Sequence, residues 1–175
     1  MIDRAGRLTL VLGGARSGKS RYAEALALSI AERPHYVATA EILDPGMAAR
    51  VADHRARRTG VWQVSEEPLY LSALLLSMAA GDVVLVDCLT VWLGNLMVNG
   101  HDVPADCAAL VDAVASTPAR LILVANEVCL APLPDNAMAR EFARHAARLN
   151  RDLAERADTV RWLMAGRPID LKPGV

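Results

Sequence analysis

The chain alternates short apolar runs with longer segments in which apolar and charged residues are mixed. A short run that is apolar throughout is typical of a strand covered on both faces of a parallel sheet. We predict strands of this kind at residues 8–12, 35–39, 83–86, 121–125 and 160–164, with a shorter strand at 62–64.

The longer segments between these runs have the composition and the end signals of helices. Several stop at proline or glycine, as at Pro34, Gly60 and Gly81, which end or break helices. We predict helices at residues 20–33, 47–58, 68–80, 90–98, 104–116 and 137–157. Strands that alternate with helices indicate an α/β fold with an open, mostly parallel sheet and helices on both faces.

Composition limits the size of the fold and the kinds of partner. The chain has 175 residues, 53% of them hydrophobic, so we expect residues 1–175 to form a single domain. The formal net charge of −1 offers no general excess of positive charge to bind nucleic acid or an anionic membrane. Aromatic residues make up 4% of the chain, few for the base-stacking surfaces of single-strand binders.

The cysteines and the apolar stretches indicate the compartment. Cys88, Cys107 and Cys129 lie far apart and form no C-x-x-C pair, which argues against a disulfide framework and a zinc site. The first residues contain no apolar run, and no later stretch reaches the roughly 20 residues of a membrane-spanning helix. We therefore expect a cytoplasmic protein without a membrane anchor.

A phosphate-binding motif lies between the first predicted strand and the first predicted helix. It fits the pattern G-x-x-x-x-G-K-[ST] with Gly13, Gly14, Ala15, Arg16, Ser17, Gly18, Lys19 and Ser20. In such a P-loop, backbone N–H groups and the helix N-terminus surround phosphate oxygens, the lysine reaches the β- and γ-phosphates, and the hydroxyl contacts Mg²⁺. A glycine-rich turn that matches by chance would not need the flanking strand and helix, so we expect a P-loop NTPase-like fold.

An acidic residue elsewhere in the chain supports the same site. Asp87 directly follows the predicted strand 83–86, as does the Walker-B aspartate that helps to hold Mg²⁺. An acidic residue at a strand end is common by itself, and its value comes from the P-loop. The residues after strand 121–125 are Asn126 and Glu127. A regulatory GTPase would have Asn-Lys-x-Asp after such a strand, so that class of protein is disfavoured.

The predicted helix 47–58 has a strongly basic face. Arg50, His54, Arg57 and Arg58 are spaced by three or four residues and so lie on one side of a helix. One interpretation is an ordinary solvated basic face with a bystander histidine. The other is a nucleophilic imidazole at phosphorus, with guanidinium groups that offset the charge of the attacked phosphate and favour the neutral imidazole.

A resemblance to a known family covers nearly the whole chain. The matching segments include the P-loop with Leu12 and Arg21, residues 36–40 (YVATA), 47–50 with Asp53, His54 and Arg55, and later 126–128, 134–136, 139–140, 149–150 and 166–172. In order and spacing they resemble the bifunctional adenosylcobinamide kinase/adenosylcobinamide-phosphate guanylyltransferase of cobalamin biosynthesis. Their specificity lies in the set rather than in the P-loop alone.

The resemblance implies two reactions on one substrate. ATP or GTP first phosphorylates the aminopropanol hydroxyl of adenosylcobinamide. GTP then guanylylates a histidine, which by position is His54, and GMP passes to adenosylcobinamide phosphate to give adenosyl-GDP-cobinamide. The resemblance also suggests a homotrimer.

The resemblance further implies where the nucleotide binds. Beyond the P-loop with its catalytic Lys19, and with Ser20 and Asp87 on Mg²⁺, it places contacts at Ala38, Thr39, Ala40, Arg55, Ala56, Arg57, Arg58, Glu66 and Asp87. A strand end such as residues 38–40 suits a ligand at the carboxyl edge of a sheet. Glu66 has an equally good interpretation as the acidic residue at the start of helix 68–80.

One position departs from the family pattern. Cys129 stands where the pattern usually has glycine, which weakens any role assigned to its loop.

Two other classes of protein remain as alternatives. A monofunctional P-loop kinase would use the basic helix only to bind phosphates and would transfer the γ-phosphate alone. A non-catalytic nucleotide-binding regulator would bind nucleotide without turning over a small substrate.

Overall fold

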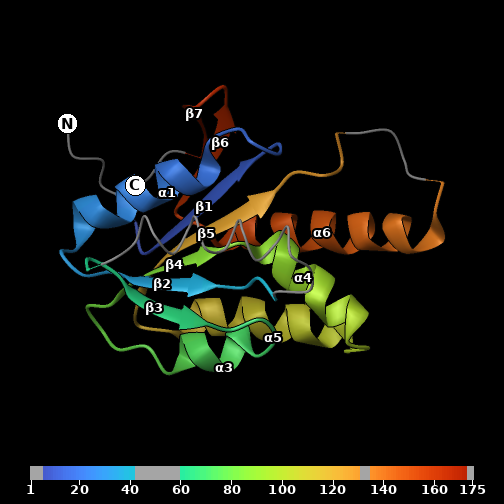
Figure 1. Ribbon diagram of the computed structural model, residues 1–175, viewed down its shortest axis with the longest axis horizontal. Coiled ribbons are helices and arrows are strands. Elements are labelled where there is room, and N and C mark those ends of the chain that lie inside the picture. The colour runs from blue at the N-terminus through green and yellow to red at the C-terminus, as the bar shows by residue number, and fades with distance from the viewer. Residues whose placement is uncertain (1–5, 42–59, 131–134, 173–175) are drawn as a thin grey trace.

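The strands predicted from the apolar runs all belong to one sheet (Figure 1). The computed structural model describes residues 6–41, 60–130 and 135–172. The strands of these residues are β1 (Leu8–Gly13), β2 (His35–Ala38), β3 (Gln63–Glu66), β4 (Val83–Asp87), β5 (Arg120–Asn126), β6 (Thr159–Met164) and β7 (Arg167–Lys172). The helices are α1 (Lys19–Ile30), α3 (Leu71–Leu76), α4 (Leu89–Val98), α5 (Val103–Ser116) and α6 (Ala137–Arg156).

The sheet has the order β3-β2-β4-β5-β1-β6-β7 within the described residues. Neighbouring strands from β3 to β6 pair in parallel, and β7 alone pairs antiparallel, with β6. The prediction of a mostly parallel sheet is therefore confirmed. Because β1 lies between β5 and β6, it is an interior strand of the sheet. The loop that follows it therefore begins in the middle of the edge formed by the carboxyl ends of the parallel strands.

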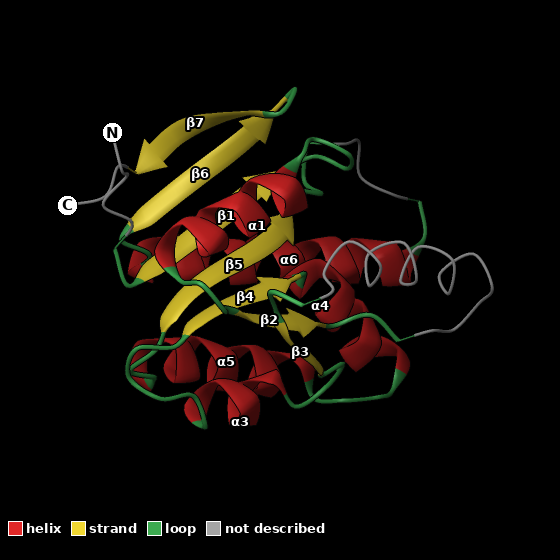
Figure 2. Cartoon of the chain, turned by 60° about the vertical axis from the view of Figure 1, so that its left-hand side comes forward, coloured by secondary structure: helices red, strands yellow, loops and turns green. Residues whose placement is uncertain are grey.

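Side chains of the central strands alternate between two apolar layers. Leu10 of β1 packs with residues of α3, α4, α5 and α6, whereas Val11 packs with Ala23 and Ala27 of α1. Figure 2 shows α1 on one side of the sheet and α3 and α5 on the other. Helices on both faces, as predicted, explain why these strands are apolar along their whole length.

Two helices are shorter than predicted, for local reasons. Helix α1 ends at Ile30 rather than at residue 33, because a residue before proline disfavours helical backbone and the chain must straighten before Pro34. Helix α3 covers only Leu71–Leu76. On its N-terminal side a Glu67 carboxylate oxygen accepts the N–H groups of Leu69 and Tyr70, and on its C-terminal side the Asp82 carboxylate accepts the N–H of Ala79. These side-chain bonds favour turns over helix. The predicted helix 47–58 lies outside the described residues.

The sequence pattern did not predict strand β7. All six of its residues are exposed and the strand contains Pro168, which suits an edge strand. A two-residue turn joins it to β6, with φ of 50° at Ala165 and 74° at Gly166. Positive φ at both positions is the type I′ geometry that fits the twist of a hairpin.

In the described part of the chain, no helix is long and apolar enough to cross a membrane.

Replacing Ala165 with glycine is expected to stabilise the protein. Alanine at φ 50° is strained, and relief of a left-handed conformation is worth about 1 kcal/mol. Urea unfolding measures the change in the free energy of unfolding. The same substitution at Ala25, an exposed position inside α1, should instead lower it by about 1 kcal/mol. Equal signs at the two sites would contradict the strain at Ala165.

Candidate functional site

Several of the predicted site residues meet at the carboxyl edge of the sheet. In the strand register Ala38 of β2 lies opposite both Glu66 of β3 and Asp87 of β4. Gly13 at the end of β1 lies beside Asn126 at the end of β5. Open α/β sheets bind their ligands at this edge, so the register alone brings the separate sequence signals together.

The P-loop has the backbone conformation that its glycines allow. Gly13 has φ of 150° and Gly18 has φ of 97°. A Cβ atom at Gly13 would lie 2.6 Å from the carbonyl oxygen of Leu163, closer than any side chain tolerates. Lys19 and Ser20 begin α1, and Gly14, Ala15 and Arg16 are exposed. The loop therefore leads from a buried strand into a helix N-terminus, whose partial positive charge favours phosphate.

The middle of the loop is fixed from outside and contains an unsatisfied polar atom. The N–H of Gly166, in the β6–β7 turn, donates to the carbonyl oxygen of Ser17 at 2.9 Å. The Ser17 hydroxyl is buried and has no hydrogen-bond partner. A buried polar group without a partner is costly, and at this position an anionic ligand oxygen would accept its hydrogen.

Lys19 is almost completely buried at the base of the loop, with 6% of its surface exposed. Its ammonium nitrogen donates to the carbonyl oxygen of Gly14 at 2.6 Å. Burial lowers the pKa of Lys19, opposed by the nearby ionisable Cys88 and Asp87. The protein thus keeps a poorly solvated cation next to the loop, and phosphate oxygens would compensate it.

Asp87 lies on the α1 side of the sheet. Val83 and Leu85 of β4 belong to the apolar layer under α1, and side chains two residues apart in a strand share a face. The Tyr36 hydroxyl donates to the Asp87 carboxylate at 2.6 Å. Tyr36 was part of the matched segment 36–40, but no signal in the sequence assigned it a role.

Thr39 is fully buried, and its hydroxyl is already engaged. The hydroxyl donates to the carbonyl oxygen of Cys88 at 2.8 Å and accepts the Cys88 N–H at 3.0 Å. The Asn95 amide donates to the carbonyl oxygens of Thr39 at 2.7 Å and Pro68 at 3.1 Å. In this state Thr39 orients the backbone next to Asp87. Asn95 was missed in the sequence, where its only signal is a polar residue within a mostly apolar helix.

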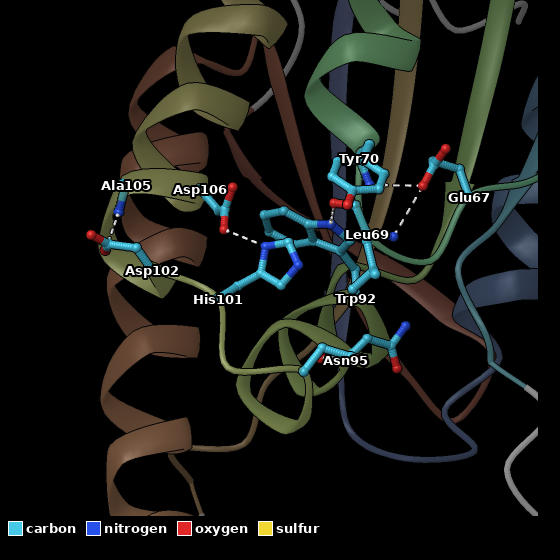
Figure 3. Close-up of polar contacts among 10 residues, drawn as sticks. Glu67, Leu69, Tyr70, Trp92, Asn95, His101, Asp102, Ala105 and Asp106 are labelled. Carbon is cyan, nitrogen blue, oxygen red and sulfur yellow. Dashed lines mark hydrogen bonds and ion pairs between the residues drawn. The ribbon is translucent and has the colours of Figure 1, made fainter.

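The segment after Glu66 is held by a polar network (Figure 3). The Trp92 indole donates to the carbonyl oxygen of Leu69 at 2.9 Å. Below it, His101 approaches the Asp106 carboxylate at 3.1 Å and the ring of Tyr70 at 6.0 Å between centroids. Helix α4 thus fixes residues 67–70, so the chain leaves Glu66, itself exposed, along a defined path.

The Asn126–Glu127 segment is tied to the P-loop strand. The Glu127 N–H donates to the carbonyl oxygen of Gly13 at 3.0 Å, and the Asn126 N–H donates to the Thr90 hydroxyl at 2.6 Å. Cys129 donates its N–H to the Glu127 carboxylate at 2.9 Å, and among described residues positive φ outside glycine occurs only at Arg16 and Ala165. The loop therefore accommodates the side chain of Cys129 without the backbone that only glycine favours.

The donors at this edge suit Mg²⁺. Asp87 supplies carboxylate oxygen and Ser20 a half-buried hydroxyl, the hard oxygen ligands that Mg²⁺ prefers. No group of three or more His, Cys, Asp or Glu residues that could hold a metal occurs in the described ranges. Mg²⁺ is usually bound through one or two protein oxygens together with substrate phosphates. The predicted site residues His54, Arg55, Ala56, Arg57 and Arg58 lie outside the described residues.

Comparison with protein families identifies the chain. Residues 9–171 match the CobU family, described as cobinamide kinase / cobinamide phosphate guanyltransferase. The chain belongs to the CobU family. Its members are bifunctional cobinamide kinases and cobinamide-phosphate guanylyltransferases of cobalamin biosynthesis, which is also the function of this protein. The family implies ATP or GTP as nucleotide substrate.

Individual relatives agree with this assignment over almost their full length. The bifunctional adenosylcobalamin biosynthesis protein CobP of Pseudomonas aeruginosa is 44% identical over 166 residues, covering 93% of this chain and 96% of the relative. The bifunctional protein CobU of Salmonella typhimurium is 38% identical, covering 94% and 99%. A solved structure from Pyrococcus horikoshii has a TM-score of 0.56 at 12% identity, covering 98% of this chain and 89% of that one. That likeness supports the fold alone.

Nucleotide binding by this CobU-family chain is expected to take up protons at alkaline pH. Burial holds the pKa of Lys19 below its usual value, and phosphate oxygens nearby would favour the charged form and raise the pKa. Between the two pKa values, Lys19 therefore gains a proton when nucleotide binds. Calorimetry of GDP binding in buffers of different ionisation enthalpy measures this uptake.

Lys19→Met should abolish the uptake. The matched control is Lys172→Met, which changes the chain's other lysine, an exposed residue on β7, and should leave the uptake intact. Proton release, or no exchange at any alkaline pH, would contradict the buried state of Lys19.

Proposed function

We propose that both reactions use one nucleotide site at the carboxyl edge of the sheet, with the triphosphate in the P-loop. The observation that carries this proposal is the loop itself: a buried cation, Lys19, and a buried unpaired hydroxyl, Ser17, lie at a helix N-terminus. Gly13, Gly14, Ala15, Arg16 and Gly18 supply the backbone around the phosphates. Asp87 ends a strand of the same edge.

In the kinase step, the aminopropanol hydroxyl of adenosylcobinamide attacks the γ-phosphorus of ATP or GTP. The bond from that phosphorus to the β-bridging oxygen breaks, the nucleoside diphosphate leaves, and the hydroxyl proton goes to solvent or a basic group. Lys19 stabilises charge on the β- and γ-phosphates, a task that depends on positioning and electrostatics. Ser20 and Asp87 would hold Mg²⁺, which when bound neutralises charge on the phosphate oxygens.

In the guanylyltransferase step, the nucleophile is His54. Its neutral imidazole nitrogen attacks the α-phosphorus of GTP, and pyrophosphate leaves. A phosphate oxygen of adenosylcobinamide phosphate then attacks the same phosphorus, breaks the P–N bond and yields adenosyl-GDP-cobinamide. Two displacements replace one, so the kinetics are ping-pong. This assignment rests on the sequence and on membership of the family.

The remaining nucleotide contacts are proposed from position. Ala38, Thr39 and Ala40 lie at or next to the end of β2, and Glu66 lies beside them at the end of β3, where backbone and carboxylate groups would face guanine or ribose. Because the Thr39 hydroxyl is engaged with Cys88, its contribution would come through the backbone. Arg55, Ala56, Arg57 and Arg58 follow His54 in sequence and would bind the phosphates next to it.

Guanylylation of His54 is tested with GTP labelled at the α-phosphate. After incubation with Mg²⁺ and denaturation, wild-type protein should retain acid-labile, alkali-stable label, because a phosphoramidate has this stability. His54→Ala should retain none and should still phosphorylate adenosylcobinamide. His145→Ala, on α6, is the matched control and should retain label. Wild-type protein that binds GTP but retains no label would favour a monofunctional kinase.

We also propose a homotrimer in the cytoplasm, on the basis of the family resemblance and of cysteines that are all free in the structure. Light scattering coupled to gel filtration should give a mass three times that of the chain at micromolar concentration. A monomeric mass over the whole concentration range would contradict the trimer and leave the nucleotide site as described.

A further inference from the structure

A hydrogen bond links strand β2 to Asp87, one of the two residues proposed to hold Mg²⁺. Tyr36 on β2 lies opposite Leu85 in the register of β4, and Asp87 follows two residues later on the same face. Two residues along a strand span about 7 Å, and the Tyr36 ring covers this distance to donate its hydroxyl to the Asp87 carboxylate at 2.6 Å. A hydrogen bond of this length to an ionised acceptor is among the strong ones in proteins.

The ring that carries this hydroxyl is itself immobilised. Tyr36 is 2% exposed and packs in the apolar layer with Ala23 and Ala27 of α1. The ring of Trp62 meets it edge to face at 5.5 Å between centroids, with an interplanar angle of 90°. The phenol is therefore a rigid donor whose position is set by the sheet and by α1, the helix that begins with Lys19.

Asp87 lies at the last position of β4 and is only half-buried. A hydrogen bond from a rigid donor narrows the rotamers that a carboxylate at such a place adopts. Its charge acts on Lys19 in the nucleotide-free protein. An oriented carboxylate at this place costs less ordering when a cation and phosphates bind than a mobile one does.

We propose that Tyr36 is a positioning residue for the nucleotide site, which fixes the orientation of the Asp87 carboxylate toward the P-loop through its hydroxyl. The inference rests on the role proposed above for Asp87. It predicts that the hydroxyl, rather than the ring, sets how strongly Mg²⁺ increases the affinity for a nucleoside diphosphate.

The experiment compares GDP binding with Mg²⁺ and with EDTA by calorimetry, in wild-type protein and in Tyr36→Phe. The substitution removes the hydroxyl and keeps the ring. Because a hydrogen bond to a charged group is worth roughly a tenfold change in an equilibrium constant, the increase in affinity due to Mg²⁺ should fall by about that factor. Binding in EDTA should stay within about twofold of wild type, since Asp87 acts through the cation.

Three further variants separate positioning from packing. Trp62→Phe keeps an aromatic ring against Tyr36 and leaves the hydroxyl in place, so it should keep the wild-type effect of Mg²⁺. Tyr70→Phe removes an exposed phenol and should also keep it. In an Asp87→Ala background, Tyr36→Phe should cause no further loss, because the hydroxyl then has no carboxylate to orient.

The outcomes distinguish this inference from the proposed site. An unchanged effect of Mg²⁺ in Tyr36→Phe, or an equal loss in Trp62→Phe, would overturn the positioning role and leave the site intact. A wild-type protein that binds no GDP under either condition would overturn the site and this inference together.

Discussion

A buried positive charge is the constraint on which this site depends. Lys19 lies beneath the P-loop with its ammonium group on the carbonyl oxygen of Gly14, and burial of a cation is tolerated only with compensation. The loop around it cannot collapse onto the charge, because Gly13 and Gly18 hold left-handed backbone and Ser17 is tied to the β6–β7 turn. The protein is thus organised to accept anionic oxygens before any nucleotide is bound.

The strand register extends this arrangement to the rest of the edge. Ala38, Glu66 and Asp87 end three neighbouring strands at one level, and the alternation of side chains puts Asp87 on the face occupied by α1. In the proposed single site, one triphosphate orientation along this edge would serve two chemistries, attack at a γ-phosphorus and attack at an α-phosphorus. Groups near the α-phosphate would then decide which reaction takes place.

The sequence predicted the elements whose signals are local and repetitive. Apolar runs such as residues 83–86 identified the parallel strands, and the P-loop pattern predicted the loop between β1 and α1, because each depends on residues close together in the chain. The Tyr36–Asp87 bond and the contacts of Asn95 depend instead on register between distant segments, which no local pattern contains. Strand β7 was missed because its exposed residues and Pro168 lack the apolar signature of the buried strands. The length of helix α3 was overestimated because the carboxylates of Glu67 and Asp82 accept backbone N–H groups that a helix would use.

The place of β1 in the sheet has a consequence for biosynthesis. This strand is made first, yet its two partners are β5 and β6, and the turn that holds Ser17 comes later still, at Gly166. Contacts between segments so far apart in sequence slow folding. On the ribosome, β1 therefore cannot complete its pairing until β5 and then β6 have emerged. The loop lacks its contact with Gly166 until that residue is made, so nucleotide cannot meet a finished loop during the synthesis of the earlier strands.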